Sequence, residues 1–321
     1  MRLGLLITAH CNAACTHCAT SCGPRRHEAL TREQLFRIMD EAAAVNEDDE
    51  LNFSISGGEP FIDFQLLLDI VAHGSALGAS IGCQSNGYWA SNDEQARSKL
   101  SALKQAGLGL LGLSISRFHD EFVRRSRVQR ALNIAKELGI ETALKCALTT
   151  GESGAEVERW ARASGADDLE LFPLHPYLRE GAQLPAADFS TPEALPGGAC
   201  PASILTVKED GRAYTCCMPG GFNDFLALGH IEKDSIADLH DLFLVQGRQQ
   251  LLRQFGPVHF ARAVAERGEA RRLRTAYADV CDLCAHITSD PRMSAIANES
   301  AAEFEAQQLQ GVFDQLMREE T

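Results

Sequence analysis

The sequence has no long hydrophobic run and too little positive charge to balance its acidic residues. Its longest apolar stretches, such as 108–115, are far shorter than the roughly 20 residues of a membrane-spanning helix. The stretch 3–7 is too short for the core of a signal peptide. The net charge of −14 argues against a phosphate backbone as a partner. We therefore expect a cytoplasmic protein that binds neither a membrane nor a nucleic acid.

Internal repeats and low-complexity segments are also missing. With 45% hydrophobic residues the chain can bury a sizeable core, which excludes a disordered protein. A length of 321 residues allows one large domain with a smaller one, or a single α/β barrel with an appendage.

Cysteines are numerous and clustered. Four of the eleven lie between Cys11 and Cys22, and five lie between Cys200 and Cys284. Disulfides are not expected in a reducing compartment. Clustered cysteines in such a chain are typical of metal or iron–sulfur ligands.

The first half alternates between short apolar runs and helical patterns. Strands are expected at 3–8, 51–56, 80–84, 109–116, 141–148 and 168–172, and helices at 32–45, 64–77, 93–106, 128–138 and 155–163. This alternation predicts an α/β fold, a partial (β/α)6 TIM-like barrel of parallel strands. Chemistry in such folds gathers at the carboxyl ends of the strands.

The pattern changes after Pro173. Residues 173–199 are rich in proline and glycine and are expected to form a linker. A hairpin is predicted from 204–208 and 213–216 around Asp210 and Gly211, followed by helices at 235–255, 258–277 and 299–318. The basic run 262–274 favours a solvated helix face over a docking patch for an acidic substrate.

The first cysteine group reads Cys11-x3-Cys15-x2-Cys18. Three thiolates on one tight loop can occupy three corners of a [4Fe–4S] cluster and leave the fourth iron without a protein ligand. Cys22 is the local candidate for a fourth ligand, and a surface or semi-buried thiol is the favoured interpretation for it.

This spacing after the first strand resembles the radical S-adenosylmethionine (SAM) superfamily. The resemblance implies that the open iron binds the amino and carboxylate groups of SAM, and that reduction yields a 5′-deoxyadenosyl radical. His17 stands where the family often has an aromatic residue, and a packing role is favoured for it over proton transfer.

Further motifs follow the next strands in order. Gly57-Gly58-Glu59-Pro60 matches the family's GGEP motif, in which glycine lets the backbone approach a ligand and the carboxylate of Glu59 would hold the SAM ammonium. Asn86, in Ser85-Asn86-Gly87, resembles the ribose-contacting segment. Ser114 and Ser116 stand at positions that often touch the ribose or the SAM carboxylate, and Lys145 is a weaker candidate.

A second ligand set lies in the C-terminal half. Cys200-x10-Gly211-x4-Cys216 is followed by Cys281-x2-Cys284, which supplies the four thiolates of another [4Fe–4S] cluster. The pattern resembles the twitch and SPASM auxiliary domains of the superfamily, in the shorter form with one cluster. A zinc ribbon built on the same cysteines is the alternative. The expected domains are a barrel at 1–176, a C-terminal auxiliary iron–sulfur domain with its linker at 177–298, and a terminal helix at 299–321.

Cys217 is left over from this ligand count. It is read either as a small buried thiol or as a redox-active thiol that donates a hydrogen atom to a substrate radical.

The resemblance implies a peptide-modifying enzyme. Relatives with auxiliary domains mostly act on ribosomally made peptides, and the pattern favours L-to-D epimerisation with Cys217 as the hydrogen donor. Peptide crosslinking, dehydrogenation of a small-molecule alcohol and a non-catalytic iron–sulfur scaffold are the alternatives. An electron donor such as flavodoxin or ferredoxin is expected, and a leader-recognition module is expected to be absent or supplied in trans.

Overall fold

The computed structural model describes residues 1–46, 50–192, 194–200 and 204–319, with 312–319 as backbone alone. The chain divides into two compact units. Unit 1 comprises Met1–Ser190, Ile204–Ala213 and Gly229–Ala237, and unit 2 comprises Thr191–Ser203, Tyr214–Leu228 and Asp238–Thr321. The units interleave along the sequence, unlike the consecutive segments 1–176, 177–298 and 299–321 that we expected.

Unit 1 is built on a parallel sheet. Its strands are β1 (Arg2–Leu6), β2 (Asn52–Ser56), β3 (Ser80–Ser85), β4 (Leu108–Ser114), β5 (Glu141–Leu148) and β6 (Asp168–Pro173). They lie side by side in the order β6-β5-β4-β3-β2-β1, all parallel, with Leu3 opposite Phe53 in the first pair. The six predicted strands and the α/β class are therefore confirmed.

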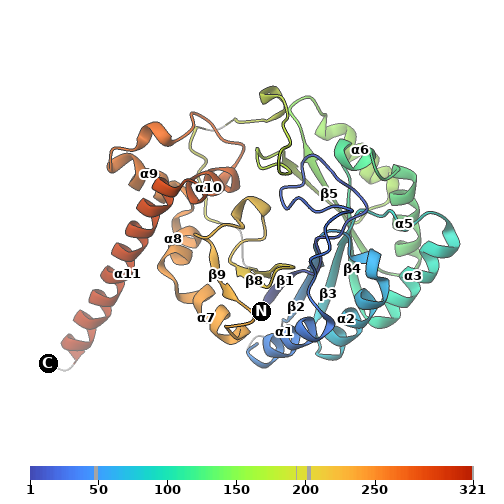
Figure 1. Ribbon diagram of the computed structural model, residues 1–321, viewed down its shortest axis with the longest axis horizontal. Helices are drawn as coiled ribbons and strands as arrows, with labels where there is room; N and C mark the ends of the chain where they lie inside the picture. Colours follow the sequence, from blue (N-terminus) through green and yellow to red (C-terminus); the bar gives the residue numbers. More distant parts are fainter. Residues whose placement is uncertain (47–49, 193, 201–203, 320–321) are drawn as a thin grey trace. The chain divides into compact units, whose positions relative to one another are not determined.

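Helices connect these strands. The principal ones are α1 (Arg32–Ala44), α2 (Phe64–Ala76), α3 (Asp93–Ala106), α5 (Arg125–Glu137) and α6 (Gly154–Ser164), and Figure 1 shows them around the outside of the strands. The start of α1 is fixed by a capping box between Thr31 and Gln34. The sequence did not predict the short helix α4 (Arg117–Asp120) or the 3₁₀ turns η1 (Pro60–Asp63) and η2 (Ala186–Asp188).

A later segment of the chain widens the same sheet. Strand β7 (Leu205–Val207) pairs in parallel with β1, and β8 (Arg212–Tyr214) and β9 (Ala227–His230) follow it in the strand order. The turn between β7 and β8 uses Gly211 at a φ of 82°, which favours glycine. The predicted hairpin therefore forms, and its first strand belongs to the barrel sheet.

Unit 2 is largely helical. Helix α7 (Ile236–Val245) leads into it, and α8 (Gly247–Phe255), α9 (Val258–Glu266), α10 (Val280–Ser289) and α11 (Pro291–Glu319) follow, with 3₁₀ turns η3 (Pro219–Gly221) and η4 (Ala270–Arg272). Buried side chains of α9, α10 and α11 form its core, with Phe260 and Met293 fully buried.

Two helix predictions in this half were wrong. The helix expected at 235–255 is two helices, because Gln246 has an extended backbone that separates α7 from α8. The helix expected at 258–277 ends at Glu266, because Gly268 adopts a φ of 80° that ends the regular helix. The terminal helix begins at Pro291, earlier than the expected residue 299.

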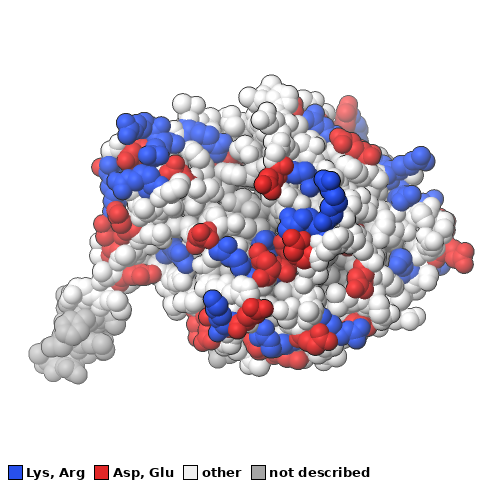
Figure 2. Space-filling view, in the orientation of Figure 1, with Lys and Arg blue, Asp and Glu red and all other residues white. Residues whose placement is uncertain are grey.

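The basic run after α9 is neutralised by acidic neighbours. Glu269 contacts Arg271, Arg272 and Arg292, and Arg272 also pairs with Asp290. Figure 2 shows basic and acidic side chains interleaved over this region. These contacts favour a solvated, ion-paired surface over a docking patch, but most of the run lies beyond the end of α9, so it is not the helix face that we expected.

Among the residues that the structure describes, no helix combines the length and the apolar character needed to cross a membrane.

Candidate functional site

The cysteine motif lies on a loop that is closed at its base. After β1, Ala9 N donates to Glu28 O at 2.8 Å and Leu30 N donates to Ile7 O at 3.0 Å. Cys11 N and Gly23 O, 3.3 Å apart, tie the loop again just before the first thiol. The chain therefore leaves β1, makes its turn through the three cysteines and returns to the same place before α1.

Burial dominates the electrostatics of this loop. Burial raises the pKa of Cys11 to about 11, and burial together with the charges of Cys11 and Cys18 raises that of Cys15 to about 12. Thiolates crowded in a poorly solvated loop repel one another and require a positive group to compensate them. A cationic iron cluster supplies such compensation, and thiolates are its ordinary ligands. The donor set at Cys11, Cys15 and Cys18 therefore fits three corners of a [4Fe–4S] cluster.

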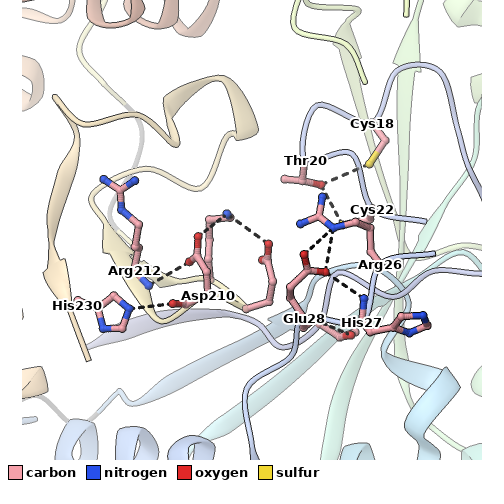
Figure 3. Close-up of polar contacts among 12 residues, drawn as sticks. Cys18, Thr20, Cys22, Arg26, His27, Glu28, Asp210, Arg212 and His230 are labelled. Carbon is pink, nitrogen blue, oxygen red and sulfur yellow. Dashed lines mark hydrogen bonds and ion pairs between the residues drawn. The ribbon is translucent and has the colours of Figure 1, made fainter. Parts of the chain in front are cut away.

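Cys22 lies beside the third thiol of the motif. The Thr20 hydroxyl is 3.4 Å from Cys18 Sγ and 3.2 Å from Cys22 Sγ. Figure 3 draws these residues. Hydrogen bonding from Cys22, followed by that from Thr20, lowers the pKa of Cys18 to about 5. Hydrogen bonding to Cys18 and burial raise the pKa of Cys22. Cys22 therefore contacts a predicted ligand, and whether it binds iron itself stays a prediction.

Arg179 is the residue of this site that sequence reasoning missed. It follows β6 and donates from Nε to Cys15 O at 3.1 Å, from Nη1 to Ser21 O at 3.2 Å and from Nη2 to Cys22 O. The proline-rich segment around it was expected to be a linker, and an isolated arginine there gave no signal.

The two glycines after β2 pack against the start of the cysteine loop. Gly57 has a φ of 132°, and a Cβ there would lie 2.6 Å from Thr8 O. A Cβ on Gly58 would lie 2.1 Å from His10 O. The close approach that requires glycine in this structure is therefore to the chain's own backbone, and approach of a ligand to the same turn stays a prediction.

Glu59 is fully buried, and its carboxylate is held by protein donors. Oε1 accepts from Phe61 N at 3.1 Å and Ser85 Oγ at 2.8 Å, and Oε2 accepts from Asn86 N at 2.8 Å. Burial raises its pKa to about 7, and these hydrogen bonds oppose the increase. These contacts join the loops after β2 and β3, and contact of the Glu59 carboxylate with the SAM ammonium stays a prediction. Pro60 begins η1 directly after Glu59.

Asn86 lies next to the cysteine loop. Its Nδ2 is 2.9 Å from Asn12 Oδ1 and 3.8 Å from Cys11 Sγ. Its Oδ1 accepts from Tyr88 N at 2.9 Å, which fixes the orientation of the amide. The structure thus brings Glu59, Asn86 and Cys11 together, while contact of Asn86 with a ribose stays a prediction.

The serines after β4 are engaged locally. Ser114 Oγ accepts from Gln84 Nε2 at 2.9 Å. Ser116 is fully buried and caps α4, and its Oγ lies 2.8 Å from His119 Nδ1. Contacts of both serines with SAM stay predictions.

His17 packs against rings of the α4 segment. Its ring is stacked on Phe118 at a centroid distance of 4.7 Å and is edge-on to His119 at 4.9 Å. Burial lowers the pKa of His17 to about 4, so the ring is neutral. Its buried Nδ1 has no hydrogen-bond partner among the described residues, which leaves a polar atom for a bound molecule.

The second cysteine set lies within unit 2. Cys281 and Cys284 stand in the first turns of α10, while Cys200 and Cys216 pack against the same core. Burial, and then the charges of Cys216, Cys200 and Cys281, raise the pKa of Cys284. The structure therefore gathers the four predicted ligands in one neighbourhood, with the donor chemistry of a second [4Fe–4S] cluster.

Cys217 is exposed, in contrast to its partly buried neighbour Cys216. Its charge adds to the effects that raise the pKa of Cys216, after burial, which is the largest. Within the described chain, no three His, Cys, Asp or Glu side chains converge as ligands of one metal ion.

Known proteins resemble this chain in sequence and in fold. A family model described as "Radical SAM superfamily" matches residues 5–163. A Bacillus subtilis (strain 168) protein named "Putative peptide biosynthesis protein YydG" is 23% identical over 230 residues, which cover 69% of this chain and 70% of that protein.

Solved structures show the same fold. "Native anSMEcpe with bound AdoMet and Kp18Cys peptide" superposes with a TM-score of 0.56 at 16% identity, covering 92% of this chain and 99% of that one. The same protein with AdoMet alone gives a TM-score of 0.53 over the same shares. The matched residues 5–163 contain the cysteine loop, the Gly57–Pro60 turn and Asn86. Residues 5–163 of this chain therefore form a radical SAM domain.

Proposed function

We propose that the chain epimerises an L-residue of a ribosomally made peptide to the D form. The observation that carries the proposal is the exposed Cys217 directly after Cys216, a member of the second cysteine set. An exposed thiol can reach a substrate, whereas its neighbours are partly buried and suited to holding a cluster.

The relatives support a peptide as the substrate class. The similar Bacillus protein carries peptide biosynthesis in its name, and the structural neighbour was solved with a peptide bound. A peptide backbone also presents the α-hydrogen that epimerisation requires.

The chain's own residues have distinct roles in this proposal. Cys11, Cys15 and Cys18 hold the first cluster, and Cys200, Cys216, Cys281 and Cys284 hold the auxiliary one. The turn of Gly57, Gly58, Glu59 and Pro60 positions SAM, with the Glu59 carboxylate on the SAM ammonium. Asn86, Ser114 and Ser116 lie around the ribose and carboxylate. When bound, the cluster and SAM supply the 5′-deoxyadenosyl radical that removes the α-hydrogen.

Cys217 then completes the reaction. Its S–H bond breaks and a C–H bond forms on the opposite face of the α-carbon, which leaves the D-residue and a thiyl radical. The thiyl radical returns to the thiol by taking up one electron and one proton. We propose that the electron comes from an external donor of the flavodoxin or ferredoxin class.

The test uses D2O, because a thiol hydrogen exchanges with solvent. Holoenzyme is incubated anaerobically with SAM, reductant and a candidate substrate peptide. We expect one deuterium on the α-carbon of the product, a gain of about one mass unit if Cys217 is the donor. Cys217→Ala should keep its iron and cleave SAM, yet form no D-residue. Cys83→Ala, a change at a buried cysteine of β3, is the matched control.

Other outcomes would contradict the proposal. A product that loses two hydrogens and takes up no deuterium indicates crosslinking or dehydrogenation. Loss of about half of the iron in Cys217→Ala would make Cys217 a ligand. A wild-type holoenzyme that releases no 5′-deoxyadenosine with SAM and reductant would be a scaffold.

A further inference from the structure

The segment after β6 is more than a linker. In residues 174–190, Leu174 is buried in a group of core side chains that includes Cys11, Cys15 and Cys22. Leu178, Leu184 and Phe189 are partly buried and pack against the same group. Asp188 ties the far end down, since its carbonyl accepts from Thr150 N and its carboxylate pairs with Arg117 at 2.8 Å. All these contacts lie within unit 1. We call residues 174–190 the strap, because the contacts hold this segment against the cysteine loop.

Arg179 is the polar centre of the strap. Its guanidinium donates to three carbonyls of the loop, those of Cys15, Ser21 and Cys22. Its backbone adds a fourth bond, from Arg179 N to Thr16 O at 3.0 Å. A planar fork of donors can join carbonyls from separate turns in a way that the single ammonium of lysine cannot.

Contacts of the strap with Ser21 and Gly23 hold the part of the cysteine loop that follows Cys18. Glu180 N donates to Ser21 Oγ at 2.9 Å, and Ser21 has a φ of 54°, rare for a residue other than glycine. Gly23 lies against the guanidinium, since a Cβ there would be 3.5 Å from Nη1. The strap therefore meets the loop on both sides of Cys18.

Charge adds to this geometry. The positive charge of Arg179 favours the thiolate forms of Cys11, Cys15 and Cys18. A fixed positive charge near a cluster also stabilises its reduced, more negative state.

We propose that the strap is part of the first cluster site and that Arg179 is its positioning residue. Its hydrogen bonds hold the loop in the ligating shape, and its charge raises the reduction potential of the cluster. The inference rests on the cluster that the proposed function assigns to Cys11, Cys15 and Cys18, and it requires no peptide.

Two variants separate the roles of shape and charge. Arg179→Lys keeps the charge but cannot bind three carbonyls, whereas Arg179→Gln loses the charge and most of the donors. Arg159→Gln is the matched control, because this arginine is exposed on α6 with only a loose contact to Glu156 at 3.9 Å. For each reconstituted holoenzyme, the rate of iron release to a chelator is measured. The EPR signal that changes when SAM is added identifies the first cluster. A redox titration of that signal gives the reduction potential of this cluster.

The expected results differ between the variants. Both Arg179 variants should lose the SAM-responsive signal roughly tenfold faster than wild type in chelator, because charged hydrogen bonds are lost. Arg179→Gln alone should also show a more negative reduction potential. Arg159→Gln should behave as wild type. Circular dichroism checks that each variant is folded, and Arg179→Lys remains informative if Arg179→Gln does not fold.

Equal chelator rates and equal potentials in all four proteins would overturn the role of Arg179. A wild-type holoenzyme with no SAM-responsive signal would overturn the first cluster itself, and with it the proposed function.

Discussion

Single residues at the site act mainly by holding the chain in place. Glu59 shows this most clearly, because its buried carboxylate accepts hydrogen bonds from Phe61, Ser85 and Asn86. Trp89 Nε1 adds to the network by donating to Ser85 Oγ at 2.9 Å. The carboxylate thus joins the loops after β2 and β3, and Asn86 extends that network to Cys11.

Burial of Glu59 predicts a dependence of stability on pH. The pKa of Glu59 in the fold is about 7, above the ordinary 4.5. Between these two pH values the folded chain therefore holds a proton on Glu59 that the unfolded chain has released. This contribution is fully present below pH 4.5 and is lost as the pH rises through 7. Between pH 6 and pH 8 the unfolding free energy should fall by about 1 kcal/mol from this group.

Anaerobic urea unfolding of wild type and Glu59→Gln at several pH values tests this prediction. The glutamine cannot ionise, so the unfolding free energy of Glu59→Gln should decline less steeply with pH. This variant should be less stable than wild type at every pH, because its Nε2 would face Asn86 N, and both groups are donors. Glu94→Gln, at an exposed position in the first turn of α3, is the control and should follow wild type. Parallel curves for wild type and Glu59→Gln would show that Glu59 does not titrate in this range.

At the scale of the elements, periodic segments could be predicted and contact-dependent ones could not. The strands and principal helices of unit 1 have regular apolar patterns, and all were found close to their expected bounds. The break at Gln246 leaves no comparable pattern in the sequence. The strap was missed for a similar reason, since prolines around Arg179 indicate a linker unless its carbonyl partners are known.

The same limit applies to the glycine motif. The sequence identified Gly57 and Gly58 correctly as positions of close approach, but it could not show that Thr8 and His10 are the groups approached. Motif spacing marks where glycine is required, and tertiary contacts decide what the glycine accommodates.

Helix α10 offers a test at this scale, because its first turns carry Cys281 and Cys284. Asp279 caps the helix, with Oδ1 accepting from Cys281 N at 2.9 Å and from Asp282 N at 3.0 Å. Asp279→Ala should reduce stability by about 1 kcal/mol, and Asp279→Asn, which keeps a capping oxygen, should lose less. Thermal unfolding measures the stability of each variant, and iron analysis measures its auxiliary cluster content. If Asp279→Ala and Asp279→Asn had equal stability and equal iron content, the cap would not support the cluster ligands.

At the scale of the whole molecule, the two cysteine sets belong to different units. Cys11, Cys15 and Cys18 lie in unit 1, and Cys200, Cys216, Cys281 and Cys284 lie in unit 2. The three cysteines of the first set pack with buried residues of unit 1, and Cys200, Cys216 and Cys284 pack against buried residues of unit 2. A cluster in one unit should therefore form without the cluster in the other.

This independence predicts the iron content of two multiple variants. The wild-type holoenzyme should hold about eight irons, and Cys11, Cys15 and Cys18→Ala together should leave about four and abolish SAM cleavage. Replacing the four cysteines of unit 2 by alanine should also leave about four, yet SAM should still be cleaved to 5′-deoxyadenosine. Iron analysis and chromatography of the nucleoside measure both. If the unit 1 variant still produced 5′-deoxyadenosine, the assignment of the radical-forming cluster would be wrong. If instead either variant lost all of its iron, the clusters would depend on each other, and the division into two units would not describe how the chain binds iron.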